Sequence, residues 1–205
     1  MKVKKAPMPL WQKVFYILSF VFLVGAFIYL GTKDYNAPIK KLTDQESFTK
    51  EFGITSDNIF DYKTGKEILE TINTGTAVIF FGFPENEWSR PYAEILNEVA
   101  KYYGIKEIYY YNFKNDRNAN NSYYENIVNK LSSFLPVLDN GTKNIYAPTV
   151  IFVKNGEIIF YDDETSINHG DITVADYWTK EKENEKKVTL GVYFQKFIED
   201  SNENK

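Results

Sequence analysis

The residues best placed to do chemistry in this chain lie at one junction, FGFPENEWSRPYAEIL, residues 81–96. There a short apolar run ends and a helical pattern begins, and two polar residues, Asn86 and Ser89, stand three positions apart. Two cysteines with this spacing at a strand-to-helix corner, a Cys-x-x-Cys pair, would support thiol redox chemistry, because the helix N-terminus lowers the pKa of a thiol. The chain has no cysteine. Thiol redox by this chain alone is therefore excluded.

Other catalytic groups are poorly supported. Ser89 would need an adjacent base to become a nucleophile, and the only histidine, His169, lies far along the chain, where we expect a loop residue. Glu85 and Glu87 could support acid–base chemistry of the kind that glycosidases use, but no cleft is defined around them. We therefore predict no catalytic residue and no enzyme activity.

Two charged stretches are expected to be solvated. The acids Asp162, Asp163 and Glu164 lack the alternating ligands and the glycine of a calcium loop, and they predict an exposed turn after a strand. The run KEKENEKK, residues 180–187, is expected to need no partner. We predict no metal site and no cofactor.

The pattern of apolar residues predicts a mixed α/β fold. AVIFF, residues 77–81, is apolar on both faces and predicts a central strand. Asn155-Gly156 predicts a hairpin turn between antiparallel strands. The other expected elements are strands over 108–113, 150–153 and 158–161 and helices over 64–76, 92–103, 123–135 and 188–200. The first two strands are joined through a helix, so we expect them to be parallel, in a sheet with helices on both faces.

An apolar segment precedes this domain. Residues 14–31 carry no charge and would span about 27 Å as a helix, enough to cross a bilayer. Trp11 and Tyr29 lie near its ends, where aromatic rings favour the membrane interface. We interpret the segment as a signal anchor; a cleaved signal peptide and a buried helix are the alternatives.

The charges around this segment predict its orientation. Four lysines and no acid lie in residues 1–13, so the positive-inside rule places that end in the cytoplasm and the domain outside the cell. Of 24 basic residues, 24 − 4 = 20 remain against 28 acidic ones, a formal charge of −8. We therefore expect no nucleic-acid partner.

The order of these elements, with a proline before the hairpin, resembles the thioredoxin fold over residues 59–200. More narrowly, the chain resembles the membrane-anchored thioredoxin-like proteins of Gram-positive bacteria. The segments that carry the resemblance are TGKEILETINTGTAVIFFGFPE, NEWSRPYAEILNEVAKYYGIKEIYYYNFKNDR, YAPTVIFVKNGEI and DYWTKEK. Residues 32–58 are then a juxtamembrane linker with a short helical segment, and residues 201–205 are a tail.

The resemblance implies a degenerate redox site. In such proteins FGFPE precedes Cys-x-x-Cys, or in some cases Cys-x-x-Ser, so Asn86 and Ser89 take the redox positions of a thiol–disulfide oxidoreductase. It also implies a cis bond between Ala147 and Pro148, facing the corner, where backbone can pair with an extended peptide. Trp88 would be exposed beside it as an apolar anchor.

Several functions stay open. One is a non-catalytic protein-binding or chaperone-like module; the others are an accessory to a cysteine-bearing partner enzyme, a structural spacer, and a vestigial site in which Asn86 and Ser89 cap a helix. The expected binding residues are Glu85, Asn86, Glu87, Trp88, Ser89, Arg90, Ala147, Pro148 and Thr149.

Overall fold

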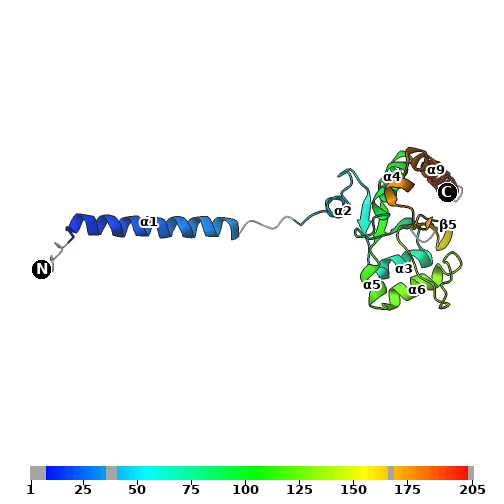
Figure 1. Cartoon of the computed structure of the whole chain (residues 1–205), viewed down its shortest axis with the longest axis horizontal. Coiled ribbons are helices and arrows are strands. Elements are labelled where there is room, and N and C mark those ends of the chain that lie inside the picture. The colour runs from blue at the N-terminus through cyan, green and yellow to red at the C-terminus, as the bar shows by residue number, and fades with distance from the viewer. Residues whose placement is uncertain (1–7, 36–40, 166–168, 203–205) are drawn as a thin grey trace. The chain divides into compact units, whose positions relative to one another are not determined.

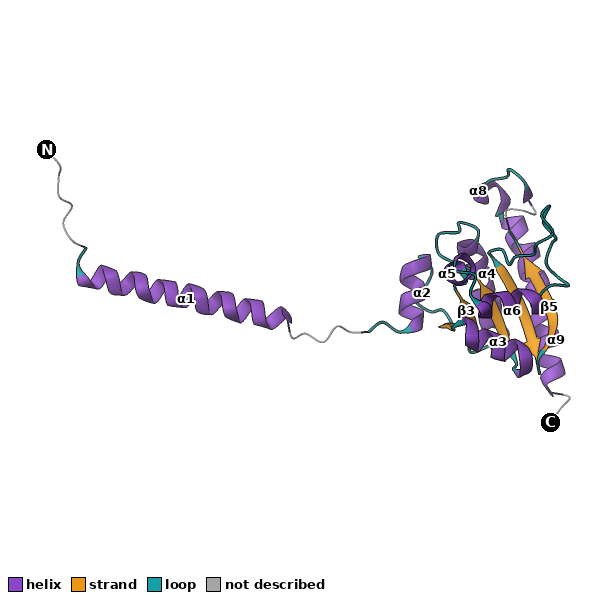
Figure 2. Ribbon diagram, turned by 90° about the horizontal axis from the view of Figure 1, so that it is seen from below, coloured by secondary structure: helices purple, strands orange, loops and turns teal. Residues whose placement is uncertain are grey.

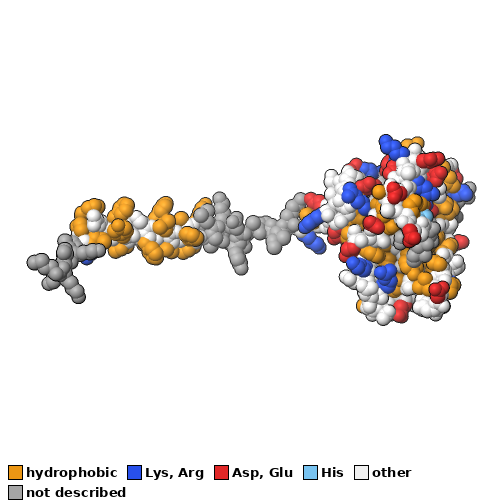
Figure 3. Space-filling view, in the orientation of Figure 1, with side chains coloured by type: hydrophobic (Ala, Val, Ile, Leu, Met, Phe, Trp, Pro, Cys, Tyr) orange, Lys and Arg blue, Asp and Glu red, His pale blue; other side chains and the backbone are white. Residues whose placement is uncertain are grey.

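The computed structural model describes residues 8–35, 41–165 and 169–202, and the chain divides into two units, Met1–Lys41 and Leu42–Lys205. Most of the lysine-rich start, the linker around position 38 and the end of the expected tail lie outside the described residues. The first unit holds α1, Leu10–Tyr35. Its Leu10–Tyr29 part has a mean hydropathy of 1.7 and, by length and composition alone, could cross a membrane or serve as a signal sequence. On the face seen in Figure 3, most of its side chains are hydrophobic.

The second unit is built on a five-stranded mixed sheet in the order β1-β3-β2-β4-β5 (Figures 1 and 2). The strands are β1 (Phe60–Tyr62), β2 (Ala77–Phe81), β3 (Ile108–Tyr111), β4 (Thr149–Lys154) and β5 (Glu157–Asp163). β1, β3 and β2 are parallel, whereas β4 is antiparallel to both β2 and β5. This confirms the expected parallel pair and hairpin.

Both faces of β2 are buried because its side chains alternate between two cores. Val78 and Phe80 pack in one core, and Ile79 and Phe81 pack in the other. An apolar run without polar alternation is what a strand covered on both sides requires. The sequence prediction for this strand is confirmed.

Helices cover both faces of the sheet (Figure 2). The helices are α2 (Asp44–Phe52), α3 (Gly65–Thr74), α4 (Ser89–Tyr102), α5 (Lys114–Asn118), α6 (Ser122–Lys130), α8 (Val174–Tyr177) and α9 (Lys180–Asn202). Side chains of α3 and α6 enter the core that contains Phe81, and those of α2, α4 and α9 enter the core that contains Phe80. The layers therefore follow the order helix, sheet, helix.

The compact unit begins at Leu42, before the resemblance starts at residue 59. The reason is aromatic packing: the Phe48 ring lies 3.9 Å from Phe60 and 4.1 Å from Phe52, centroid to centroid, and all three rings are buried. α2 begins with a capping box in which Thr43 and Glu46 exchange side-chain and backbone hydrogen bonds.

Several boundaries differ from the prediction. β1, only three residues long, was not predicted, and α6 stops at Lys130 instead of reaching residue 135. α4 begins at Ser89 and α9 at Lys180, earlier than the expected 92 and 188. The added turns of α9 are formed by the charged run, residues 180–187, because Lys186 in that run is buried in the domain.

The hairpin turn between β4 and β5 depends on Gly156. Its φ is +81°, and a Cβ there would lie 2.2 Å from the carbonyl oxygen of Asn73. Its N–H also donates to the Gly75 carbonyl at 2.9 Å, so the turn is fixed against the end of α3. Gly141 has a similar φ, +79°, but open space around its Cα.

We expect Gly156→Ala to destabilise the protein more than Gly141→Ala. Both variants place a Cβ at positive φ, at a cost of about 1–2 kcal/mol. Only Gly156→Ala adds a clash with backbone, worth a further ~1–3 kcal/mol. Thermal unfolding followed by circular dichroism measures both. Equal losses in the two variants would contradict the packing at the turn.

Candidate functional site

The two redox-like positions touch each other. Oδ1 of Asn86 accepts a hydrogen bond from the backbone N–H of Ser89 and another from its hydroxyl, both at 3.0 Å. Asn86 therefore fixes the turn that leads into α4, whose N-cap residue, Trp88, makes no side-chain capping bond. Ser89 is fully buried, and its hydroxyl is donated to an amide oxygen rather than to a base. The pair is arranged to hold this turn and not as a nucleophile.

The surface around this corner is charged. Glu85, Glu87 and Arg90 are exposed, and Arg90 pairs with the side chain of Glu94 at 3.5 Å. Lys114 lies 2.9 Å from the Glu85 carboxylate. Its hydrogen bond holds the pKa of that carboxyl below the ordinary value, which makes Glu85 a poor general acid. The idea of a paired-carboxylate site gains no support from this geometry.

Trp88 is buried, and the expectation that it stands exposed beside the corner is wrong. Its side chain is 3% exposed. The imidazole of His169 stacks on it with ring centroids 5.2 Å apart and 20° between the planes, and the ring of Tyr177 lies 5.1 Å away. We call His169 and Tyr177 the aromatic cap. These two residues come far later in the sequence, so no local pattern could indicate that they cover Trp88.

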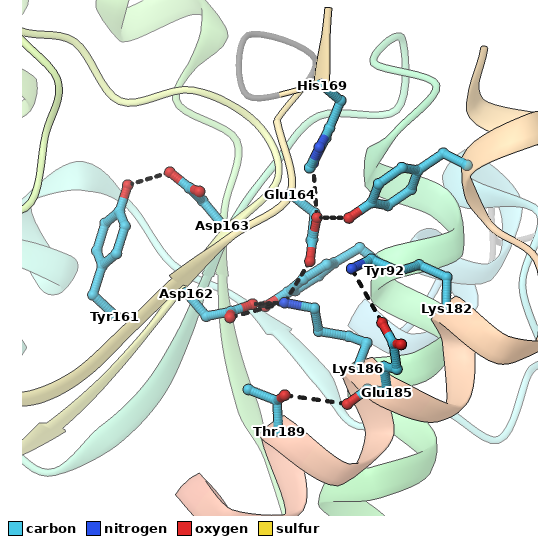
Figure 4. Close-up of polar contacts among 11 residues, drawn as sticks. Tyr92, Tyr161, Asp162, Asp163, Glu164, His169, Lys182, Glu185, Lys186 and Thr189 are labelled. Carbon is cyan, nitrogen blue, oxygen red and sulfur yellow. Dashed lines mark hydrogen bonds and ion pairs between the residues drawn. The ribbon is translucent and has the colours of Figure 1, made fainter. Parts of the chain in front are cut away.

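His169 is therefore part of the corner, contrary to its expected place in a remote loop. Its Nε2 lies 2.8 Å from Oε2 of Glu164, a buried carboxylate (Figure 4). The same oxygen accepts a hydrogen bond from the hydroxyl of Tyr177. Glu164 thus contacts both members of the aromatic cap at one atom, but only Tyr177 is hydrogen-bonded to it.

Glu164 belongs to a buried ionic cluster that we call the buried triad: Asp162, Glu164 and Lys186. Nζ of Lys186 lies 2.8 Å from both carboxylate oxygens of Asp162 and 2.6 Å from Oε1 of Glu164. All three side chains are at most 10% exposed. Figure 4 shows the lysine reaching from α9 to the end of β5. The expectations of a solvated acidic turn and of a charge run without partners are both wrong at these residues.

Two tyrosines complete the hydrogen bonding of the triad. Tyr92, on α4 and fully buried, donates its hydroxyl to Asp162 at 2.6 Å, and Tyr177 donates to Glu164. Burial, together with the neighbouring Asp162 charge, raises the pKa of Tyr92 well above its ordinary value, so this hydroxyl stays a donor. The triad therefore connects α4, β5, α8 and α9.

The charges in the triad stabilise one another. Burial by itself raises the pKa of Glu164, but hydrogen bonds from Lys186 and Tyr177 outweigh it and leave that pKa lowered. Burial likewise opposes the charge on Lys186, yet the Asp162 charge and hydrogen bond dominate and raise the lysine pKa. Both groups are thus charged at neutral pH.

The segment from Ala147 to Thr149 lies beside the corner, because Thr149 pairs with Phe81 at the end of β2. The Ala147–Pro148 bond is cis, which is the geometry the resemblance implies. The Pro148 carbonyl accepts the N–H of Glu164 at 3.3 Å, so this segment also contacts the chain around the triad. Among the described residues, the backbone N–H and C=O of Ala147 meet no hydrogen-bond partner, although Ala147 is only 5% exposed.

The arrangement offers no metal site among the described residues, since no group of three or more candidate ligands is present there. It fixes the start of α4, buries Trp88 and leaves the backbone N–H and C=O of Ala147 without a hydrogen-bond partner among the described residues. One sequence signal could have revealed the triad. Lys186 precedes Leu190 and Phe194 at intervals of four, so the apolar face of α9, extended backwards, reaches it.

We expect Lys186→Met to cost about 3–5 kcal/mol, because it leaves two buried carboxylates without their cation. Lys187→Met is the matched control: Lys187 pairs with Glu98 on the surface at 2.7 Å, a contact worth at most about 1 kcal/mol. The unfolding midpoint of the full chain in detergent measures both, with about 2–4 °C lost for each kcal/mol. Similar midpoints for the two variants would mean that the triad does not stabilise the fold.

Comparison of the chain with protein-family models, with curated proteins and with solved structures finds no match. No relative therefore assigns a role to the corner, the aromatic cap or the buried triad.

Proposed function

We propose that this protein is a membrane-anchored, thioredoxin-like domain that binds a protein partner and catalyses no redox reaction. Three features support the thioredoxin-like part of the proposal. The strand order places two parallel neighbours before an antiparallel hairpin, the corner follows the central strand β2, and the side chains at the two redox positions are in contact. Asn86 is half-buried and Ser89 is fully buried. The two redox positions therefore differ in solvent access, as expected if position 86 held the attacking residue and position 89 the resolving one.

The membrane part of the proposal depends on α1. Leu10–Tyr29 is long and apolar enough to span a bilayer, and the excess of lysine before it favours a cytoplasmic N-terminus. The domain from Leu42 onward would then lie outside the cell. In that position it would meet other surface or secreted proteins.

The observation that carries a binding function is the unpaired backbone of Ala147. Buried N–H and C=O groups are nearly always hydrogen-bonded, because leaving them unpaired costs free energy. An extended peptide laid along residues 146–148 would supply both partners by strand addition. Exposed Glu87 and Arg90 lie at the neighbouring corner, where they could meet polar or charged side chains of that peptide.

The vestigial interpretation explains Asn86 and Ser89 as caps but gives no reason for Ala147 to stay unpaired. Thiol–disulfide exchange by this chain's own residues is ruled out by the absence of cysteine. Strand addition is therefore the function that the geometry supports best.

Photo-crosslinking in living cells tests the binding function. A photoreactive residue in place of Glu87 should capture one or a few defined proteins, because position 87 is exposed at the corner. Glu107 is the matched control: it is also exposed, but it precedes β3 and so lies at the opposite end of the parallel strands.

The products at the two positions decide the outcome. Defined products from position 87 alone would support a binding surface at the corner. A broad set that grows under unfolding stress would support the chaperone-like form of the same function. Equal products, or none, from the two positions would leave the corner as a vestigial helix cap.

Restoring cysteines tests the thioredoxin-like part separately. The Asn86→Cys, Ser89→Cys double variant should close an intramolecular disulfide under mild oxidation, because the present side chains already meet at 3.0 Å. Thiol titration of the purified chain measures this, with each single variant as a control that keeps one free thiol. Two free thiols in the oxidised double variant would contradict the proposed frame.

A further inference from the structure

One cation, Arg117, lies beside the segment that carries the unpaired backbone of Ala147. Phe81 pairs with Thr149 in the sheet, and because these strands are antiparallel, Phe83 and Ala147 lie two positions beyond that pair. Both contact the core that contains Phe81. The Phe83 ring is half-buried, and the guanidinium carbon of Arg117 lies 5.8 Å from its centre.

A second set of contacts connects Arg117 to the same segment. Its guanidinium carbon lies 5.4 Å from the centre of the Phe113 ring, and that ring stacks on Tyr124 with centroids 5.9 Å apart. The Tyr124 hydroxyl accepts the backbone N–H of Ile145, two residues before Ala147, at 3.3 Å. Burial raises the pKa of Tyr124, and the charge of Arg117 opposes that rise, as expected for a cation close to this hydroxyl.

Arg117 has no counter-charge, because no carboxylate among the described residues forms an ion pair with it. The neighbouring Lys114, by contrast, pairs with Glu85 at 2.9 Å, and Asp116 accepts the Tyr111 hydroxyl. The two aromatic rings restrain the arginine side chain, and its fork of N–H donors matches a carboxylate. Within the described part of the chain, those donors are therefore available to an anion.

We propose that the extended peptide added at Ala147 is acidic, and that Arg117 binds a carboxylate side chain of that peptide. This inference rests on the proposed function, because it names the partner chemistry of the same surface. An added strand directs alternate side chains to opposite faces, so every second side chain of the peptide would lie on the face of Phe83 and Arg117. An aspartate or glutamate there would gain a charge-assisted, bidentate hydrogen bond.

The charge of the whole domain opposes an acidic peptide, so the preference has to be local. Beyond the apolar segment, acidic residues outnumber basic ones. That excess alone would favour basic peptides. At physiological ionic strength, however, exposed charges separated by more than about 8 Å are largely screened. A direct contact with Arg117 therefore outweighs the distant acids.

The test selects peptides from a phage-displayed library of randomised heptapeptides, with the full chain held in detergent micelles. We expect Asp or Glu to be enriched at one position of the selected peptides. A synthetic peptide from that selection, and the same peptide with Asn or Gln in place of the acid, provide an acidic and a neutral probe. The unchanged chain should bind the acidic probe about tenfold more tightly, as for a hydrogen bond to a charged group.

Arg117→Met removes the charge and keeps a flexible apolar side chain against the two rings. In this variant the acidic probe should bind about tenfold more weakly, whereas the neutral probe should bind as before, because both changes remove the same contact. Unchanged binding of the neutral probe also shows that the variant is folded. Arg117→Lys, which keeps the charge but loses the fork of donors, should give an intermediate affinity.

Lys106→Met is the matched control. Lys106 is exposed and precedes β3, so it lies at the opposite end of the parallel strands, and its loss changes the net charge equally. Selection of neutral or basic peptides would overturn the acidic preference and leave strand addition standing. An acidic preference that persists in Arg117→Met, or that falls equally in Lys106→Met, would overturn the role of Arg117. No selected peptide from any of these chains would count against the proposed function itself, and with it this inference.

Discussion

The buried triad is the interaction on which the rest of the site depends. Lys186 brings a positive charge from α9 to two carboxylates at the end of β5, and each carboxylate accepts a tyrosine hydroxyl from a helix. An isolated charge in that position would cost several kcal/mol, so each member requires the others. The triad thereby connects elements that the sheet alone would not hold together: the start of α4, the short helix α8 and the long helix α9.

This connection changes how the corner is understood. Without the triad, FGFPENEWSRPY would be a redox-shaped turn with an exposed tryptophan and two capping residues. With it, Glu164 bonds the Tyr177 hydroxyl and contacts His169, the two rings that cover Trp88, and its backbone N–H donates to the carbonyl of Pro148. The corner is closed on one side and offers unpaired backbone at Ala147 on the other. That combination is the basis of the binding function proposed above.

The parts of the fold that could be predicted from sequence are those fixed by neighbouring residues. AVIFF predicted a strand buried on both faces, and Asn155-Gly156 predicted the hairpin because both residues adopt positive φ there. Trp88 and Lys186 were misplaced because their burial depends on partners distant in sequence, and a charge looks solvated until its counter-charges are known. The four-residue spacing from Lys186 to Phe194 was the available hint. Nothing comparable linked His169 to Trp88.

The most direct test of the account is amide hydrogen exchange in α8, measured by mass spectrometry on the full chain and on Lys186→Met. If the triad holds the aromatic cap, the amides of Tyr177 and Trp178, which donate to Thr173 and Val174 at 3.0 Å, should exchange much faster in the variant. Lys187→Met should leave them unchanged. Unaltered exchange at these two amides in Lys186→Met would contradict the claim that the triad closes the corner.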